Sequence, residues 1–295
     1  MNHIIEVKNL TKDYGHGKGV FDVNLSVKQG EVFGFLGPNG AGKTTTIRNL
    51  MGFIRPDKGN CSILSLDCYH DAAKIQEHLG YLAGEIAFLD DLSGKQLLDF
   101  IASMKGIKDK SRITELMELF ELNPAGRLKK MSKGMKQKVG IISAFMGEPD
   151  IIILDEPTSG LDPLMQNRFI DLILNEKKKG KTIFMSSHIF EEVERTCDRT
   201  AIIKDGKIVA IEDMATLKEK KSKSYIATFK DAESAEAFRK ETTGVIEAVG
   251  NKVTVQIKGN VLPFLQSVTK HEVKDLDVQV QTLEEIFLHF YGGAK

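Results

Sequence analysis

The stretch Glu31-Val-Phe-Gly-Phe-Leu-Gly-Pro-Asn-Gly-Ala-Gly-Lys-Thr44 decides the fold of this chain. Residues 31–36 form a short apolar run that ends in glycine, as expected for a buried strand that feeds a loop. Two glycines separated by four residues follow, with Lys43 and Thr44 directly after them, which is the pattern of a phosphate-binding loop (P-loop). Residues 45–50 then begin a plausible helix, so the motif stands between a strand and a helix, as its chemistry requires.

The residue types of this loop suit the phosphates of a nucleotide. Glycines let backbone N–H groups curl around the anionic phosphates, and the following helix directs its positive end at them. We expect the Lys43 ammonium to neutralise the terminal phosphates and the Thr44 hydroxyl to ligate Mg²⁺. The predicted nucleotide-binding residues of the loop are Gly37, Pro38, Asn39, Gly40, Ala41, Gly42, Lys43, Thr44 and Thr45.

A second apolar run carries acidic residues at its end. Residues 151–154 read Ile-Ile-Ile-Leu, which is typical of a strand covered on both faces of a parallel sheet. Asp155 follows at the carboxyl end, where it could hold Mg²⁺ through water, and Glu156 could polarise an attacking water. The two acids could instead only cap the next helix. The phosphate-binding loop in the same chain favours the first interpretation.

The remaining patterns indicate an α/β domain. Apolar residues recur at helical spacing between about residues 85 and 146, and residues 182–185 read as another buried strand. Residues 201–210 read as a hairpin with Asp205-Gly206 at its turn. Strands that alternate with helices favour a largely parallel sheet.

A smaller module is predicted behind this domain. The charged run 218–224 is interpreted as a linker. After it the chain shows the order strand-helix-strand-strand-helix-strand, with its last strand at 278–280 and a final helix at 283–291, which predicts an α+β module of the ferredoxin-like, split βαβ type. We expect the following limits: domain 1–217 with a helical subdomain at about 85–146, linker 218–224, and C-terminal module 225–295.

Composition narrows the class of protein. A length of 295 residues suggests about two domains, and 41% hydrophobic with 28% charged residues is ordinary for a soluble globular protein. The 41 basic and 41 acidic residues cancel, so no basic excess indicates a nucleic-acid partner.

The chain has no apolar run near the length of about 18 residues that spans a membrane. Glu6 and Lys8 stand where a signal peptide would be apolar, and the odd set of three cysteines lacks metal-ligand spacing, so we expect a cytoplasmic protein with reduced thiols.

With these and further motifs, the chain resembles the ATP-binding-cassette (ABC) ATPases, the nucleotide-binding subunits of ABC transporters. The family signature, in its usual form leucine-serine-glycine-glycine-glutamine, appears as Met131-Ser-Lys-Gly-Met135. The loop after the acidic strand matches Ser159-Gly-Leu-Asp162, and the switch histidine matches His188. Tyr14 matches the aromatic residue that stacks on adenine. The motifs occur in the family's order over roughly residues 1–218.

The resemblance implies a role for each matched residue. Glu156 would be the catalytic carboxylate, and His188 would hold the γ-phosphate and the attacking water. The signature residues would contact the ATP of a second protomer, identical or paralogous: Ser132, Lys133, Gly134 and Met135. Ser159 and Asp162 would lie in the dimer interface. Mg-ATP would then close the dimer and hydrolysis would open it, as two states that differ in their γ-phosphate contacts.

One position departs from the family pattern. ABC ATPases normally carry a glutamine that reaches Mg²⁺ and links to the membrane subunit, whereas this chain has Gly84, followed by Glu85. Glycine has no side chain to coordinate a metal. Either Glu85 or a water therefore takes the role in this coupling loop.

The signature sequence and the C-terminal sequence Leu283-Glu-Glu-Ile-Phe-Leu288 resemble those of bacterial exporter cassettes of the ABC-2 type. The resemblance implies an ATP hydrolase attached to the inner face of the cell membrane through separate transmembrane permease subunits, with no nucleic-acid partner. A soluble ABC-type ATPase acting on ribosomes or DNA is the alternative, and such relatives usually carry two cassettes or a long coiled-coil insertion. A regulatory cassette with vestigial hydrolysis is a third possibility.

Overall fold

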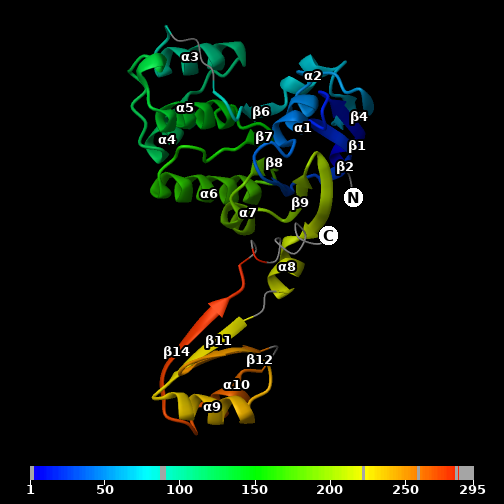
Figure 1. The fold of residues 1–295 in the computed structure, drawn as a ribbon. Coiled ribbons are helices and arrows are strands. Elements are labelled where there is room, and N and C mark those ends of the chain that lie inside the picture. The colour runs from blue at the N-terminus through cyan, green and yellow to red at the C-terminus, as the bar shows by residue number, and fades with distance from the viewer. Residues whose placement is uncertain (1–2, 87–90, 221–222, 258–259, 283–284, 286–295) are drawn as a thin grey trace. The chain divides into compact units, whose positions relative to one another are not determined.

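A computed structural model of the chain describes residues 3–86, 91–220, 223–257, 260–282 and 285. The chain divides into two compact units, residues 1–214 and 215–295 (Figure 1). The stretch predicted to be a linker contributes to two elements, since it holds the end of helix α8 (Met214–Lys220) and the start of strand β11 (Lys223–Phe229). In the part of the chain that the structure describes, the helices lack the length and apolar composition needed to cross a bilayer.

A six-stranded sheet lies at the centre of the first unit, in the order β10-β9-β3-β8-β7-β6. Its strands are β3 (Val32–Leu36), β6 (Leu79–Leu82), β7 (Ile151–Asp155), β8 (Thr182–Ser187), β9 (Arg199–Lys204) and β10 (Lys207–Asp213). Five of these strands run parallel, and β10 pairs antiparallel with β9 through the predicted hairpin. β3, β7 and β8 are buried along their whole length because layers cover both faces of the sheet. The predicted mixed sheet is confirmed.

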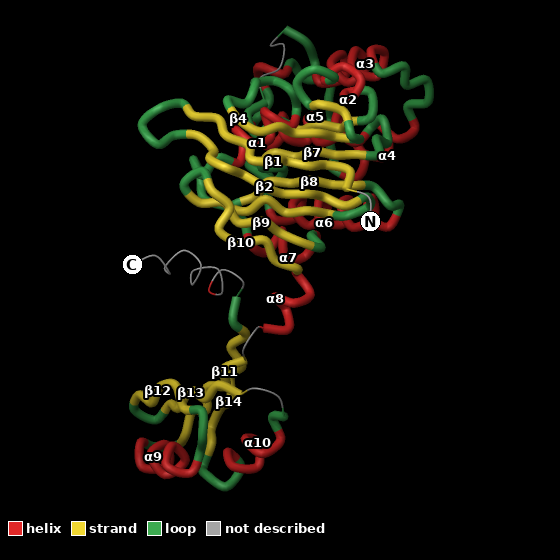
Figure 2. Tube along the Cα trace, turned by 90° about the vertical axis from the view of Figure 1, so that its right-hand side faces the viewer, coloured by secondary structure: helices red, strands yellow, loops and turns green. Residues whose placement is uncertain are grey.

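A second, antiparallel sheet and helix α1 cover one side of the central sheet (Figure 2). Its strands, in the order β2-β1-β4-β5, are β1 (His3–Asp13), β2 (Gly19–Lys28), β4 (Lys58–Ile63) and β5 (Leu66–Asp67). One hydrophobic cluster joins Val7 and Val27 of this sheet to Ile47 of α1 (Lys43–Leu50) and to Phe35 and Ile153 of the central sheet. This core fixes α1, and with it the phosphate-binding loop, against the carboxyl edge of the parallel strands.

The segment predicted to be helical consists of α3 (Gly94–Met104), α4 (Ser111–Leu119), the short 3₁₀ helix η1 (Leu128–Lys130) and α5 (Lys133–Phe145). Ser93 and Gln96 form a capping box at the start of α3, which satisfies two backbone donors. The helices α2 (Ala72–Gln76), α6 (Pro163–Lys178) and α7 (Phe190–Thr196) complete the first unit. The helical signature subdomain is therefore present.

In the described residues, the sheet of the second unit has four antiparallel strands in the order β12-β13-β11-β14, and the helices α9 and α10 connect its strands. Its further elements are α9 (Ala232–Glu241), β12 (Val245–Val249), β13 (Lys252–Ile257), α10 (Leu262–Val268) and β14 (Val273–Val280). Phe229, Phe238, Val255 and Phe264 form its core. Topology and order confirm the split βαβ prediction, although the last strand begins earlier than expected. Of the final helix predicted at 283–291, only residue 285 is described.

Candidate functional site

Three neighbouring parallel strands bring the predicted site residues together. The phosphate-binding loop begins at Gly37, directly after β3, while Asp155 and Glu156 lie at the end of β7 and His188 follows β8. β3, β8 and β7 are neighbours in the sheet, so their carboxyl ends lie at one edge. Ligands of open α/β sheets bind outside this edge.

The phosphate-binding loop holds its shape through glycines and through Lys43. Gly42 has a φ of 109°, and a Cβ there would lie 2.5 Å from Val20 Cγ1, so a side chain is excluded by conformation and by space. Lys43 Nζ donates hydrogen bonds to the carbonyl oxygens of Gly37 (2.6 Å) and Pro38 (3.2 Å). Thr44 is exposed at the first turn of α1. The loop therefore presents a cation, a hydroxyl and a helix N-terminus to one side.

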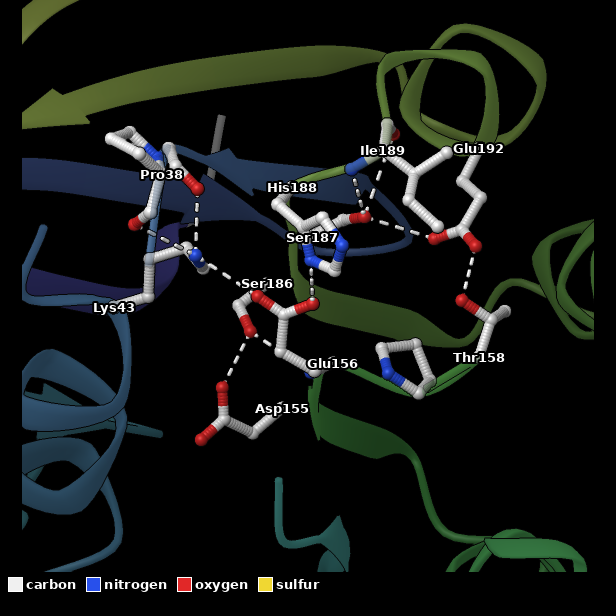
Figure 3. A network of polar contacts seen from close by, with 12 residues as sticks. Pro38, Lys43, Asp155, Glu156, Thr158, Ser186, Ser187, His188, Ile189 and Glu192 are labelled. Atoms are coloured by element: carbon white, nitrogen blue, oxygen red, sulfur yellow. Dashed lines mark hydrogen bonds and ion pairs between the residues drawn. The ribbon is translucent and has the colours of Figure 1, made fainter. Parts of the chain in front are cut away.

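Glu156 joins Lys43 of the phosphate-binding loop to His188 (Figure 3). Its Oε1 lies 2.9 Å from Lys43 Nζ, and its Oε2 lies 2.5 Å from His188 Nδ1. Lys43 is only 5% exposed, whereas the His188 side chain is 47% exposed. A phosphate that entered the loop would compete with Glu156 for Lys43, which would release one carboxylate oxygen to accept a proton.

Asp155 is fully buried beside Glu156, and its two carboxylate oxygens differ. Ser186 donates a hydrogen bond from Oγ to Oδ1 (2.6 Å) and accepts one from the Glu156 backbone N–H (3.0 Å). Oδ2 has no hydrogen-bond partner among the described residues. Burial raises the pKa of Asp155, and the hydroxyls of Ser186 and Thr44 oppose that effect. A buried carboxylate oxygen without a donor is costly unless a ligand satisfies it.

This orphaned oxygen fits a magnesium ion. Asp155 supplies a carboxylate, and Thr44 supplies a hydroxyl that favours the ionised form of the same carboxyl group and so lowers its pKa. Within the described ranges no cluster of three or more His, Cys, Asp or Glu side chains could hold a metal. Mg²⁺ commonly takes one or two protein carboxylates and completes its shell with phosphate oxygens and waters, so these residues suffice.

The coupling-loop glycine lies directly against this oxygen. A Cβ at Gly84 would lie 3.0 Å from Asp155 Oδ2, so the backbone at residue 84 approaches the carboxylate more closely than a side chain would comfortably allow. Glu85 is exposed, and residues 87–90 lie outside the described residues. The departure at residue 84 thus removes a side chain at a position in close contact with the candidate metal ligand.

The signature residues begin helix α5. Ser132 caps the helix, and its Oγ accepts a hydrogen bond from the Met135 backbone N–H (3.2 Å). Ser132 and Lys133 are exposed. A Cβ at Gly134 would lie 2.7 Å from the carbonyl oxygen of Gly160, so only glycine fits where the signature meets the loop after β7.

The remaining predicted residues occupy loops and helix starts. Asp162 caps α6 through a hydrogen bond from the Met165 backbone N–H to Oδ1 (3.0 Å), and Ser159 N–H bonds the Glu156 carbonyl (3.1 Å). Tyr14, between β1 and β2, is 52% exposed, so its ring is available to a ligand.

The sequence analysis overlooked several buried polar side chains around Glu156. Besides Ser186, they include Glu192 of α7, which is 3% exposed and bonds the hydroxyls of Thr158 and Ser187. Burial raises the pKa of Glu192, and these two hydroxyls oppose the rise. Gln137 of α5 also reaches the Glu156 backbone. Two signals were available in the sequence: the serine pair at the end of an otherwise apolar strand, and Gln137, which follows the signature by two residues.

Comparison with known proteins gives consistent matches over the first unit, and one relative matches nearly the whole chain. Residues 20–159 match the family model described as ABC transporter. The chain is 39% identical over 229 residues to the bacitracin transport ATP-binding protein BcrA of Bacillus licheniformis, which covers 77% of this chain and 74% of that protein. It is 32% identical to the linearmycin resistance ATP-binding protein LnrL of Bacillus subtilis, over 98% of each chain. A structure described as a dimeric bacterial ABC transporter cassette, MJ0796, superimposes with a TM-score of 0.65 at 25% identity, over 71% of this chain and 98% of that one.

Proposed function

Since the chain belongs to the ATP-binding proteins of the ABC transporter family, we propose that it powers a membrane exporter whose transmembrane subunits are separate polypeptides. The chain is an ATP hydrolase of this family. The observation that carries the hydrolytic part of this proposal is the position of Glu156 between Lys43 and His188, next to the orphaned oxygen of Asp155. That arrangement supports binding of a triphosphate and activation of a water.

The residues of the site have complementary roles in this proposal. The backbone N–H groups of residues 37–45 and the Lys43 ammonium bind the phosphates, and Tyr14 stacks on the adenine. Glu156 accepts a proton from the attacking water as a general base, and His188 orients the γ-phosphate and that water. Asp155 and Thr44 would hold Mg²⁺, which supplies charge neutralisation at the phosphates when bound.

A second protomer completes the site in this proposal. Ser132, Lys133, Gly134 and Met135 would meet the ATP bound to the partner's phosphate-binding loop, and Ser159 and Asp162 would line the interface between protomers. The exposure of Ser132 and Lys133 at the start of α5 supports this role, since the helix N-terminus is free to meet an anion. The dimeric state named for the MJ0796 cassette also supports it.

The exporter assignment depends on the relatives. One is named for bacitracin transport and another for linearmycin resistance, and both names suit removal of a compound from the cell. The chain would then lie in the cytoplasm, attached to the inner face of the membrane through its permease. The unit formed by residues 215–295 would support the dimer or regulate it.

Co-purification from native membranes tests the proposal. After solubilisation in mild detergent, we expect a multi-span polypeptide to accompany the chain and to stimulate its ATP hydrolysis. Recovery with ribosomes or DNA would replace the exporter by an ABC ATPase of the translation or repair kind. For the dimer, Glu156→Gln should trap an ATP-bound dimer in size-exclusion chromatography. A variant that stays monomeric in saturating Mg-ATP would contradict closure by ATP.

A further inference from the structure

A buried amide connects the signature helix to the catalytic carboxylate of the same chain. Gln137 lies on α5, just after the first turn of the helix, and is 2% exposed. Its Nε2 donates to the backbone carbonyl oxygens of Pro157 (2.7 Å) and Glu156 (3.2 Å). Both donors of one amide nitrogen are thereby directed at the two peptide groups that follow the Glu156 side chain.

The backbone that Gln137 holds is in an unusual conformation. Glu156 has a φ of 49°, in the left-handed region that residues other than glycine rarely occupy. This conformation directs the carboxylate towards both Lys43 and His188. A sparsely populated conformation persists only where surrounding contacts fix it. The N–H of Glu156 donates to the Ser186 hydroxyl, and its carbonyl accepts from Gln137 Nε2 and from the Ser159 N–H, so the residue is held from both sides.

The start of the same helix packs on the loop that follows Glu156. The space at Gly134 is closed by the carbonyl of Gly160, and a Cβ at Gly160 would lie 3.0 Å from Cγ of Lys133. The signature turn therefore contacts residues 156–160 at two places, at Gly160 through its first residues and at Glu156 and Pro157 through Gln137. A packed interface of this kind transmits a displacement instead of absorbing it.

We infer that Gln137 is a positioning residue that holds Glu156 of its own chain in place and ties it to the signature turn. The inference rests on the proposed function, in which that turn binds the ATP of the second protomer. Binding of the signature to ATP at one site would then fix the position of the catalytic carboxylate at the other site through Gln137. The two ATP sites of a dimer would be coupled by a hydrogen-bonded contact within each chain.

Gln137→Met tests the role of the amide, because methionine keeps the length of the side chain and removes its donors. We expect kcat for ATP hydrolysis to fall about 10- to 100-fold, the scale for a misplaced catalytic group. The KM for ATP should stay within about twofold, since ground-state binding is left intact. Ser143→Ala is the matched control, because Ser143 lies on the same helix and also bonds a carbonyl, that of Gly140 (2.7 Å). It should leave kcat unchanged.

Mixed dimers separate positioning from a general structural defect. Active chains are mixed with an excess of the inactive Glu156→Gln chain, so that each active chain has an inactive partner. Gln137→Met is then placed either in the active chain or in the inactive one. We expect the loss of kcat only when Gln137→Met and the intact Glu156 are in the same chain.

The other outcomes overturn the inference. Loss only when the substitution is in the inactive chain would mean that Gln137 serves the partner's phosphate through the signature. Equal loss in both arrangements, or a rise in KM to match the fall in kcat, would indicate a structural role alone. Capture of the active chain on a tagged Glu156→Gln chain in Mg-ATP is read first as a control, and chains that do not associate would instead count against the proposed dimer.

Discussion

Both units of the chain bury an apolar core, and they differ in the polar and charged side chains that they bury besides it. The described residues of the second unit bury an apolar core around Phe229, Phe238 and Phe264, and none of the polar side chains described there is fully buried. In the first unit, charged and polar groups such as Lys43, Asp155 and Glu192 are buried at the carboxyl edge of the sheet. Burial of such groups costs stability unless each finds a partner. Clustering of such groups at one edge of the sheet marks a candidate site on physical grounds, independently of any motif.

The comparison extends to the partners of the buried groups. Hydroxyls bond both carboxylate oxygens of Glu192, whereas Asp155 keeps one oxygen without a donor. A satisfied carboxylate serves to fix elements relative to one another. An unsatisfied one is available to a ligand. The following predictions test these differences, between the units and within the first of them.

The largest effect is expected at the phosphate-binding loop. Lys43→Ala removes the buried cation that bonds Gly37 and Pro38 and pairs with Glu156. We expect ATP hydrolysis to fall by about 10²- to 10³-fold, the scale for loss of one preorganised charge-stabilising donor, together with a loss of nucleotide affinity. Phosphate release and equilibrium ATP binding measure the two effects. Lys178→Ala, at an exposed position at the end of α6, serves as the control and should change neither hydrolysis nor ATP binding. Unchanged ATP binding in Lys43→Ala would contradict the assignment of Lys43 to the phosphates.

A large effect confined to the second unit is expected from Phe238→Ala. Phe238 is fully buried against Phe229 and Phe264, and its truncation should destabilise that unit by about 3–5 kcal/mol. Basal ATP hydrolysis should persist, because the site residues belong to the other unit. Hydrogen exchange of residues 215–295 and phosphate release are the measurements. The counterpart variant Ile152→Ala, in β7, should destabilise the first unit by about 2–5 kcal/mol. Equal loss of hydrolysis in the two variants would contradict the expectation that the site depends on the first unit alone.

A smaller effect of opposite sign is expected from Asp155→Asn. The folded-state pKa of Asp155 is raised, mainly by burial, above the unfolded value of about 3.9. The stability that this protonation contributes is therefore present below the unfolded pKa and is lost as the pH rises through the folded pKa. Burial therefore disfavours the ionised carboxylate at neutral pH, and Asp155→Asn should raise the free energy of unfolding by about 0.5–2 kcal/mol while hydrolysis is lost.

Urea denaturation as a function of pH measures this effect. The stability gain of Asp155→Asn should be largest at neutral pH and should vanish at acidic pH, where both side chains are uncharged. Asp171→Asn, at an exposed position of α6, serves as the control. A gain that is independent of pH would show that the charge of Asp155 is not its cause.

The smallest effect is expected in the coupling loop. If Glu85 takes the metal role that Gly84 cannot, Glu85→Ala should weaken the apparent Mg²⁺ affinity in ATP hydrolysis by about tenfold, as losses of supporting metal contacts do. Glu85→Gln, which keeps an oxygen at the same reach, should lose less. A titration of hydrolysis against Mg²⁺ decides between the two candidates, because an unchanged midpoint in Glu85→Ala would assign the role to a water.

Local patterns in the chain were enough to predict most of the fold. The apolar runs at 31–36 and 151–154 became β3 and β7 because fully buried parallel strands contain little except apolar residues. The order of elements after residue 224 predicted the split βαβ unit. The limits of elements were less accurate, as at β14 and α8, since the first and last residues of an element are fixed by contacts that a local pattern does not contain.

The sequence by itself determined the nature of the site: a glycine-rich loop with Lys43 and Thr44, and acids at the end of a buried strand, specify phosphate chemistry through residue type and spacing alone. Only the tertiary structure decided which groups share that site. It placed Glu156 between Lys43 and His188, left Oδ2 of Asp155 without a donor beside Gly84, and brought Gln137 to the Glu156 backbone. The physical reason is that the pairing order of parallel strands brings together segments that are distant in sequence. A hydrogen bond between two such segments does not change the local pattern of residues in either one, so the sequence alone does not predict it.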